Sequence, residues 1–125
     1  MRLSTLLTLA GFLGVVFGIG FLLAPAPTLA FYGASTDAVG LQMSRFFGAA
    51  LLQAGLVLVL SRNVTETSTQ RGIVFGSFLG SLAGLSVGVA GQLAALANGL
   101  GWSTVALYGL LLLGYGWFLF SKKAA

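Results

Sequence analysis

The sequence predicts an all-α protein, a bundle of four transmembrane helices forming one membrane domain over residues 1–125. First, 58% of the residues are hydrophobic and only 6% are charged, and the mean hydropathy is +1.03, outside the range of soluble domains. Second, four apolar segments are each long enough, at about 1.5 Å per residue, to cross a bilayer core of about 30 Å. Third, lysine and arginine flank these segments. We expect spans over about 3–24, 39–60, 72–97 and 102–120.

The composition excludes several classes of chemistry. Cysteine and histidine are absent, which removes disulfides, thiolate or imidazole metal ligands, and histidine acid–base catalysis. No paired carboxylates, activated nucleophile or phosphate-binding loop can be assembled from the remaining residues. The net charge of +4 comes from scattered basic residues, so we expect no nucleic-acid partner. We also expect no catalytic residue, metal or cofactor.

The first span begins after Arg2 and contains the glycines Gly11, Gly14, Gly18 and Gly20. Small residues permit close helix packing in a membrane, so we expect this helix to pack against the third span. A cleaved signal peptide is the alternative, with a cleavage site near Ala24, but the apolar stretch exceeds the usual core of about 7–15 residues.

The connection to the second span begins with Pro25 and Pro27, which end the first helix. A loop or a short interfacial helix is expected there, with Phe31 and Tyr32 at the headgroup level. Asp37 is expected to start the second helix, because its carboxylate suits exposed amides and the helix dipole.

The second span carries Gln42, Arg45 and Gln53, and Arg45 is a charge inside an apolar segment. One interpretation is that Arg45 snorkels outward, near Asp37 or a lipid headgroup; the other is that it holds an anionic ligand or a partner's carboxylate. At about 100° per residue, Gln42 and Gln53 lie about 20° apart, with Arg45 about 60° to one side. We expect a polar stripe facing inward and contacting Gln92, as either interhelical contact or the lining of a solute path.

The third span has glycine at every fourth position, at Gly72, Gly76, Gly80, Gly84 and Gly88. Each costs about 1 kcal/mol against alanine in an exposed helix, so another backbone is expected against them. We predict that this helix is the core of the bundle, and that Val74 and Phe78 face lipid. Because a four-residue step drifts about 40°, the glycines should cross one neighbour at a right-handed angle or be shared between two. A glycine face left wholly open would indicate oligomerisation.

The remaining connections set the topology. Residues 61–71 form the main polar loop, in which Glu66 is expected to be solvated, and a tight uncharged turn around Asn98 leads to the fourth span. Trp102 at one end, and Tyr115 with Trp117 near the other, are expected to anchor the fourth span at the interfaces. Five of the six basic residues fall on one side of the predicted membrane: Arg2, Arg62, Arg71, Lys122 and Lys123. The positive-inside rule therefore predicts cytoplasmic termini.

Several of these features carry a resemblance to a known kind of protein. The first span ends in Leu-Ala-Pro at residues 23–25, Tyr32-Gly33 follows, and residues 45–52 are RFFGAALL. With the Gly/Ser-rich third span and the aromatic fourth, the chain resembles small uncharacterised bacterial four-span membrane proteins, domains of unknown function. The resemblance implies this architecture and no activity. We expect a multi-pass protein of the cell membrane, in a bacterium the inner membrane.

We therefore expect a non-enzymatic membrane protein. It would be an accessory or scaffolding subunit, or a homo-oligomer assembled through the glycine-rich helix, with the lipid bilayer, itself or a larger membrane complex as partners. The rival prediction is a transporter or channel for a small solute, with Arg45 and the three glutamines lining its path; a membrane enzyme comes third.

Overall fold

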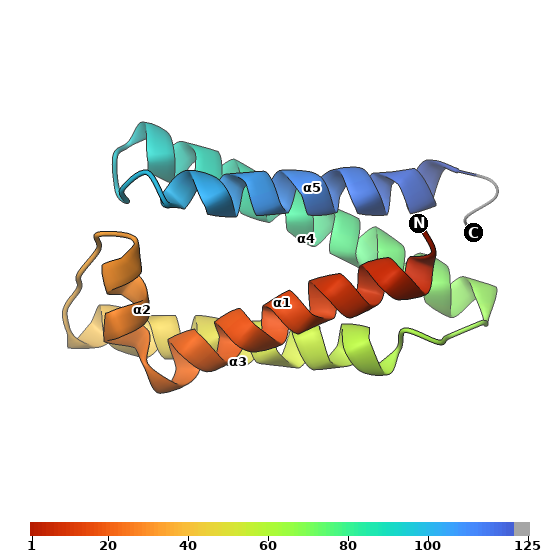
Figure 1. Ribbon diagram of the computed structural model, residues 1–125, viewed down its shortest axis with the longest axis horizontal. Coiled ribbons are helices and arrows are strands. Elements are labelled where there is room, and N and C mark those ends of the chain that lie inside the picture. The colour runs from red at the N-terminus through yellow and green to blue at the C-terminus, as the bar shows by residue number, and fades with distance from the viewer. Residues whose placement is uncertain (122–125) are drawn as a thin grey trace. The chain divides into compact units, whose positions relative to one another are not determined.

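The computed structural model describes residues 1–121, and the described chain contains helices and no strand. Five helices follow one another: α1 (Leu3–Leu23), α2 (Pro25–Phe31), α3 (Ala38–Leu60), α4 (Thr67–Leu93) and α5 (Gly101–Phe120) (Figure 1). All but α2 are long and apolar enough to cross a membrane. The prediction of an all-helical fold with four such helices is confirmed. Lys122 and Lys123, expected to follow the fourth span, lie outside the described residues.

The helix α4 begins five residues before the expected start of the third span, because Glu66 caps it. The Glu66 carboxylate accepts hydrogen bonds from the backbone N–H groups of Ser68 (3.0 Å) and Thr69 (2.7 Å). It also accepts from the hydroxyls of the same two residues. These bonds satisfy amides that the first turn of a helix leaves without partners. Glu66 is therefore a structural cap and not simply a residue of a solvated loop.

The other end of α4 lies four residues before the expected one, because the backbone turns at Ala95. Ala95 adopts a left-handed φ of 57°, and its N–H donates to the Gln92 carbonyl at 3.0 Å. Leu96 N–H donates to the Gly91 carbonyl, also at 3.0 Å. This pair of bonds is the Schellman motif, in which glycine usually occupies the left-handed position. Alanine occupies it here, which hid the helix end from the sequence pattern.

The connection between the first two long helices contains the short helix α2. Pro25 is its first residue, where the missing N–H of proline costs nothing. The helix ends in a second Schellman pair, in which Ala34 N–H donates to the Leu29 carbonyl, and Gly33 takes the left-handed φ of 68°. The α3 helix then begins at the predicted cap, with Gly40 N–H donating to Asp37 Oδ1 at 2.9 Å.

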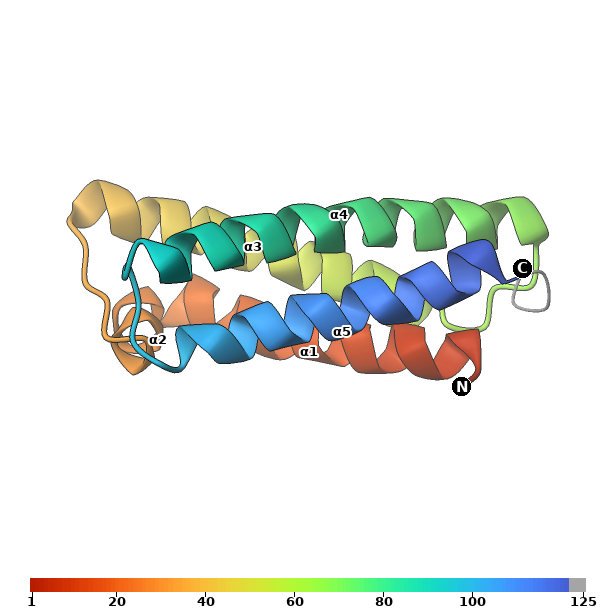
Figure 2. The same ribbon diagram turned by 90° about the horizontal axis from the view of Figure 1, so that it is seen from above.

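The chain divides into two compact units, which are described separately. One contains residues 7–62, with most of α1 and all of α2 and α3; the other contains residues 1–6 and 63–125, with α4 and α5. The view from above also shows α2 at the C-terminal end of α1 (Figure 2).

In the first unit, α1 and α3 meet through glycines. A Cβ added at Gly18 would lie 2.6 Å from the Leu52 nitrogen, and one added at Gly55 would lie 2.6 Å from the Gly11 carbonyl oxygen. Gly48 would collide in the same way with the backbone of α1 at Leu22. The expected partner of the first-span glycines was the third span; for Gly11, Gly14 and Gly18 the structure gives the second span instead. The close approach lets the two backbones interlock without intervening side chains.

In the second unit, α4 and α5 run antiparallel, with Gly84 opposite Tyr108 and Gly88 opposite Val105. Val74 is buried, and Phe78 packs edge-on against Phe120 with ring centroids 5.9 Å apart. The expectation that Val74 and Phe78 face lipid is therefore wrong. An apolar side chain looks the same in sequence whether a neighbouring helix or lipid will cover it.

The prediction that Tyr115 anchors the last helix at the membrane interface is also wrong. Its side chain is 1% exposed, whereas its neighbour Trp117 is 64% exposed. The difference follows from the 3.6-residue period, which turns residues two apart to very different sides of a helix. Trp102 and Trp117 keep the exposure that an anchoring role needs, and Tyr115 belongs to the core of the unit.

Candidate functional site

The five glycines of α4 fall on two sides of the helix. Taking Gly72 as 0°, the four-residue step turns Gly84 to about 120° and Gly88 to about 160°, near the buried Val74 at about 200°. Gly84 and Gly88 accordingly pack against α5. A Cβ added at Gly72, Gly76 or Gly80 would meet no atom within 4 Å. Within this unit, Gly84 thus meets a tyrosine ring rather than a backbone, and Gly76 and Gly80 meet no neighbour.

The uncovered side of α4 is here named the open face. It consists of exposed small residues with larger apolar side chains among them: Gly72, Phe75, Gly76, Leu79, Gly80, Ala83, Val87 and Ala90. Gly76, Ala83 and Ala90 follow one another at seven-residue intervals. The α1–α3 contact uses the same interval, from Gly11 to Gly18 and from Gly48 to Gly55. The open face therefore repeats the spacing with which this chain makes its closest helix pair.

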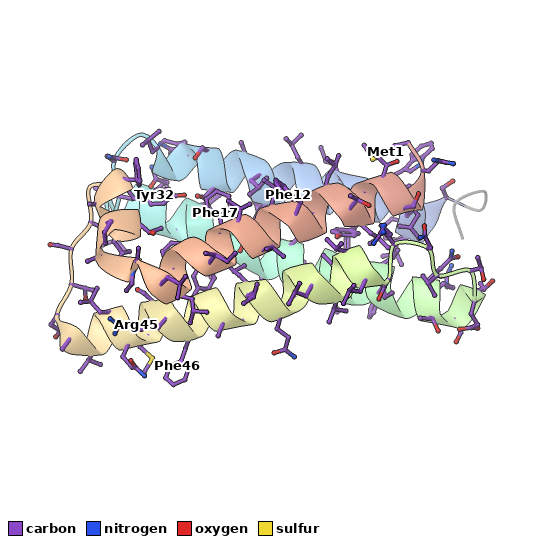
Figure 3. The ribbon with its side chains drawn as sticks, turned by 60° about the horizontal axis from the view of Figure 1, so that its bottom comes forward. Met1, Phe12, Phe17, Tyr32, Arg45 and Phe46 are labelled. Atoms are coloured by element: carbon purple, nitrogen blue, oxygen red, sulfur yellow. The ribbon has the colours of Figure 1, made fainter. Side chains whose placement is uncertain are left out.

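Arg45 lies on α3 toward its N-terminal end, beside Phe46 (Figure 3). Its side chain is exposed, and within residues 1–121 it makes no hydrogen bond or ion pair. At about 100° per residue it lies about 60° from Gly48, on the flank of the surface that contacts α1. The structure thus leaves a charged group uncovered on an apolar helix.

The three glutamines have different surroundings within their own units. Gln42 and Gln53 are exposed and lie about 120° and 140° from Gly48, on the side of α3 away from the α1 contact. Gln92 lies in the last turn of α4, and its Nε2 donates to the Asn98 carbonyl oxygen of the α4–α5 connection at 3.2 Å. Its role is to hold the connection, and the amide also fits closely against Gly101.

Both acidic side chains of the protein are occupied by helix capping. Asp37 binds the first turn of α3, and Glu66 binds the first turn of α4. The Thr69 hydroxyl, followed by the backbone amides of Ser68 and Thr69, lowers the pKa of Glu66 from 4.5 to about 2. Hydrogen bonds to the charged form favour that form, which explains the direction. Both carboxylates therefore have a structural role at the start of a helix.

The sequence argument missed a buried group of hydroxyls between α4 and α5. Ser81 is buried at 5% exposure, and the enclosed Tyr115 hydroxyl lies near Ser77 without a hydrogen bond of normal geometry to any described residue. Serines four residues apart, followed by Gly84 and Gly88, lie on one side of α4. This spacing could have been recognised in the sequence, because it predicts a helix side of small and partly polar residues, against which a neighbouring helix can pack.

The described residues offer no metal centre, because no three His, Cys, Asp or Glu side chains among them lie close enough to hold an ion. Searches of curated proteins and of solved structures found no match. A family model described as a domain of unknown function (DUF8292) matches residues 8–122. That match covers nearly the whole chain, with most of α1 and all of the four later helices, and it agrees with the resemblance to an uncharacterised family. The chain therefore belongs to the DUF8292 family.

Proposed function

We propose that the protein is a non-enzymatic component of the cell membrane that crosses it four times and assembles with further copies of itself through the open face of α4. The four long apolar helices support the membrane location. The basic residues around the helices support cytoplasmic termini, by the positive-inside rule. The resemblance to small bacterial four-span proteins supports the inner membrane of a bacterium as the site.

The observation that carries the proposal is the empty space beside Gly72, Gly76 and Gly80. Where α1 and α3 meet, glycines allow backbone contact; on the open face, the same residue type has no neighbour within its own unit. Lipid gives glycine no benefit over alanine or leucine, whereas another helix gains dispersion contacts from the close approach. A further helix against the open face therefore accounts for these glycines.

A second copy in the same orientation fits this face. The positive-inside bias favours one orientation, so two copies related by a two-fold axis along the membrane normal would place α4 against α4. The open face is uncharged, and Arg71 lies about 100° from Gly72, so like charges would not meet on it. Assembly with another membrane protein as an accessory or scaffolding subunit is the other form of the same proposal.

Sedimentation equilibrium in a density-matched mild detergent tests the proposal. The wild-type protein should sediment as a dimer or larger assembly, and Gly80→Leu should shift it toward monomer, because the leucine separates the helix axes. Gly99→Leu is the matched control, since a side chain there also meets nothing within 4 Å but lies outside the helices. A wild-type monomer that does not associate at any protein-to-detergent ratio would contradict self-assembly.

Transport of a small solute remains the rival proposal. Neither unit by itself supports it, because Gln92 is used in the α4–α5 turn and Gln42 and Gln53 are exposed away from the α1 contact. Flux of ions or small osmolytes into proteoliposomes, with Arg45→Gln as the blocked variant, tests this rival. Flux that requires Arg45 would favour transport over assembly.

A further inference from the structure

Arg45 is an exposed cation with large apolar side chains near it in the sequence. Met43, Phe46 and Phe47 are all exposed, and Ser44 lies between Met43 and Arg45. The guanidinium carries a positive charge and five N–H donors. A charged group of this kind in an apolar segment requires an oxygen acceptor, and within residues 1–121 it has none.

Among the described residues, neither acidic side chain pairs with Arg45. The sequence contains two acidic residues, Asp37 and Glu66, and each caps the helix that follows it. A second copy of the chain has the same two carboxylates in the same capping roles. Charge complementarity therefore points to a negative group from outside the protein.

The position of Arg45 along α3 indicates where that group lies. The 23 residues of α3 span about 34 Å, a few ångströms more than the hydrocarbon core of about 30 Å. Arg45 comes seven residues after Ala38, about 10 Å along the axis, and helical side chains lean toward the N-terminal end. A long side chain that leans this way brings its guanidinium back toward the headgroup boundary, where lipid phosphates lie.

Gln42 adds a second polar group on the same stretch. It precedes Arg45 by three residues, so it lies one turn nearer the N-terminal end and about 60° around the helix. Its amide carries two N–H donors, and it is exposed like Arg45. Phe46, which follows Arg45 and is 60% exposed, offers apolar surface to an acyl chain.

We propose that Arg45 and Gln42 form a binding site for the phosphodiester group of a membrane phospholipid, with Phe46 against its acyl chain. The guanidinium snorkels to the headgroup and binds the phosphate through its positive charge and N–H donors, and the Gln42 amide binds the same group from the next turn. This inference depends on the membrane embedding proposed above. It does not depend on self-assembly, because α3 carries the site and α4 carries the open face.

Lipid retention in native mass spectrometry tests the site. Full-length protein is exchanged into mixed micelles that contain phosphatidylglycerol and a phosphate-free galactolipid of matched acyl chains. The wild type should retain phosphatidylglycerol preferentially, and Arg45→Gln should reduce this retention by at least about tenfold, the lower end of the effect of losing a hydrogen bond to a charged group. Arg45→Lys should stay within about threefold of wild type, because lysine also snorkels and binds phosphate as a point charge.

Arg62→Gln is the matched control, because the Arg62 guanidinium already donates to the Val59 carbonyl oxygen at 2.7 Å. Its retention should equal that of the wild type. Equal retention in the wild type and Arg45→Gln, or no preference for the phospholipid over the galactolipid, would overturn the proposal. Displacement of the lipid by millimolar inorganic phosphate would also overturn it, since the ligand would then be a free anion.

Flotation with liposomes separates this inference from the proposed function. If the wild-type protein fails to float with vesicles, the membrane embedding fails and the lipid site fails with it. If wild type and Arg45→Gln float equally but retain phosphatidylglycerol equally, only the site fails. Arg45→Lys keeps the test decisive even if Arg45→Gln does not fold, because a site made by charge and snorkelling predicts that the lysine variant retains the lipid.

Discussion

Replacing Gly18 by alanine introduces one methyl group at the closest approach of α1 and α3. The new Cβ would lie 2.6 Å from the Leu52 nitrogen and 2.9 Å from both the Gly48 carbonyl oxygen and Leu52 Cα. All three atoms belong to the backbone of α3, so no side-chain rotation relieves the overlap. Ordinary contact begins at 3.4 Å, so the helices must separate locally by about 0.8 Å, the difference between 3.4 and 2.6 Å.

The loss of folding free energy caused by this separation can be estimated. A gap of about 0.5–1 Å forfeits a quarter to a half of each dispersion contact, and overpacking in a well-packed core costs about 1–3 kcal/mol. The gain in helix propensity from glycine to alanine is at most about 1 kcal/mol. We expect Gly18→Ala to lower the free energy of unfolding by about 1–2 kcal/mol. Gly76→Ala makes the same chemical change where nothing lies within 4 Å, and folding of the single chain should be unchanged or stabilised by up to about 1 kcal/mol.

The assay follows the separation of α1 and α3 in mixed micelles as sodium dodecyl sulfate is added. Because the chain has no cysteine, a donor–acceptor dye pair can be placed on cysteines introduced at Val16 and Val57, which are both about half exposed. The Gly18→Ala midpoint should fall below that of the parent, and the Gly76→Ala midpoint should not. Equal midpoints for the two variants would refute the assignment of the α1–α3 glycine contact.

Three further predictions follow from the caps and the topology. The pKa of Glu66 is lowered in the folded protein, so its ionised carboxylate should stabilise the fold fully above pH 4.5, and this stabilisation should be lost as the pH falls through about 2. A Glu66→Gln variant should therefore show a smaller fall in unfolding midpoint between pH 7 and 2.5 than the wild type. Ala95→Gly should raise the thermal midpoint in detergent, by about 0.5–1 kcal/mol of stability, because glycine takes the left-handed conformation without the alanine Cβ penalty; a lower midpoint would contradict the Schellman assignment. Single cysteines at Ser35 and Ser68 should react with an impermeant thiol reagent in intact cells only at Ser35, and labelling at Ser68 would overturn the predicted topology.

The positions of the long helices could be predicted from sequence, because length, hydropathy and flanking charges are local properties. Asp37 was likewise predicted as a cap, since aspartate is a common residue at that position. Glu66 was missed because glutamate seldom caps a helix through its own side chain. The end of α4 was missed because an alanine, Ala95, takes the left-handed turn that glycine usually marks.

The packing faces could not be predicted in the same way. Small residues occur on two sides of α4, and a four-residue repeat winds from one side to the other between Gly72 and Gly88. Hydropathy does not separate a side chain that meets lipid from one that meets another helix, so Val74 looked exposed and is buried. The sequence argument grouped Gln92 with Gln42 and Gln53 in one stripe because it extended the third helix to residue 97. The helix ends at Leu93, and the Gln92 amide instead donates to the Asn98 carbonyl oxygen in the connection that follows.

Disulfide cross-linking in native membranes tests the central claim, that copies of the chain meet through the open face of α4. A single cysteine replaces Ala83, near the centre of that face, or Leu113, which is 72% exposed on α5. With a mild oxidant, the Ala83→Cys protein should form a disulfide-linked dimer within minutes, and the same change combined with Gly80→Leu should not. Leu113→Cys should remain monomeric throughout. Equal dimer yields from the two cysteines, or a dimer from Leu113→Cys alone, would contradict assembly through α4.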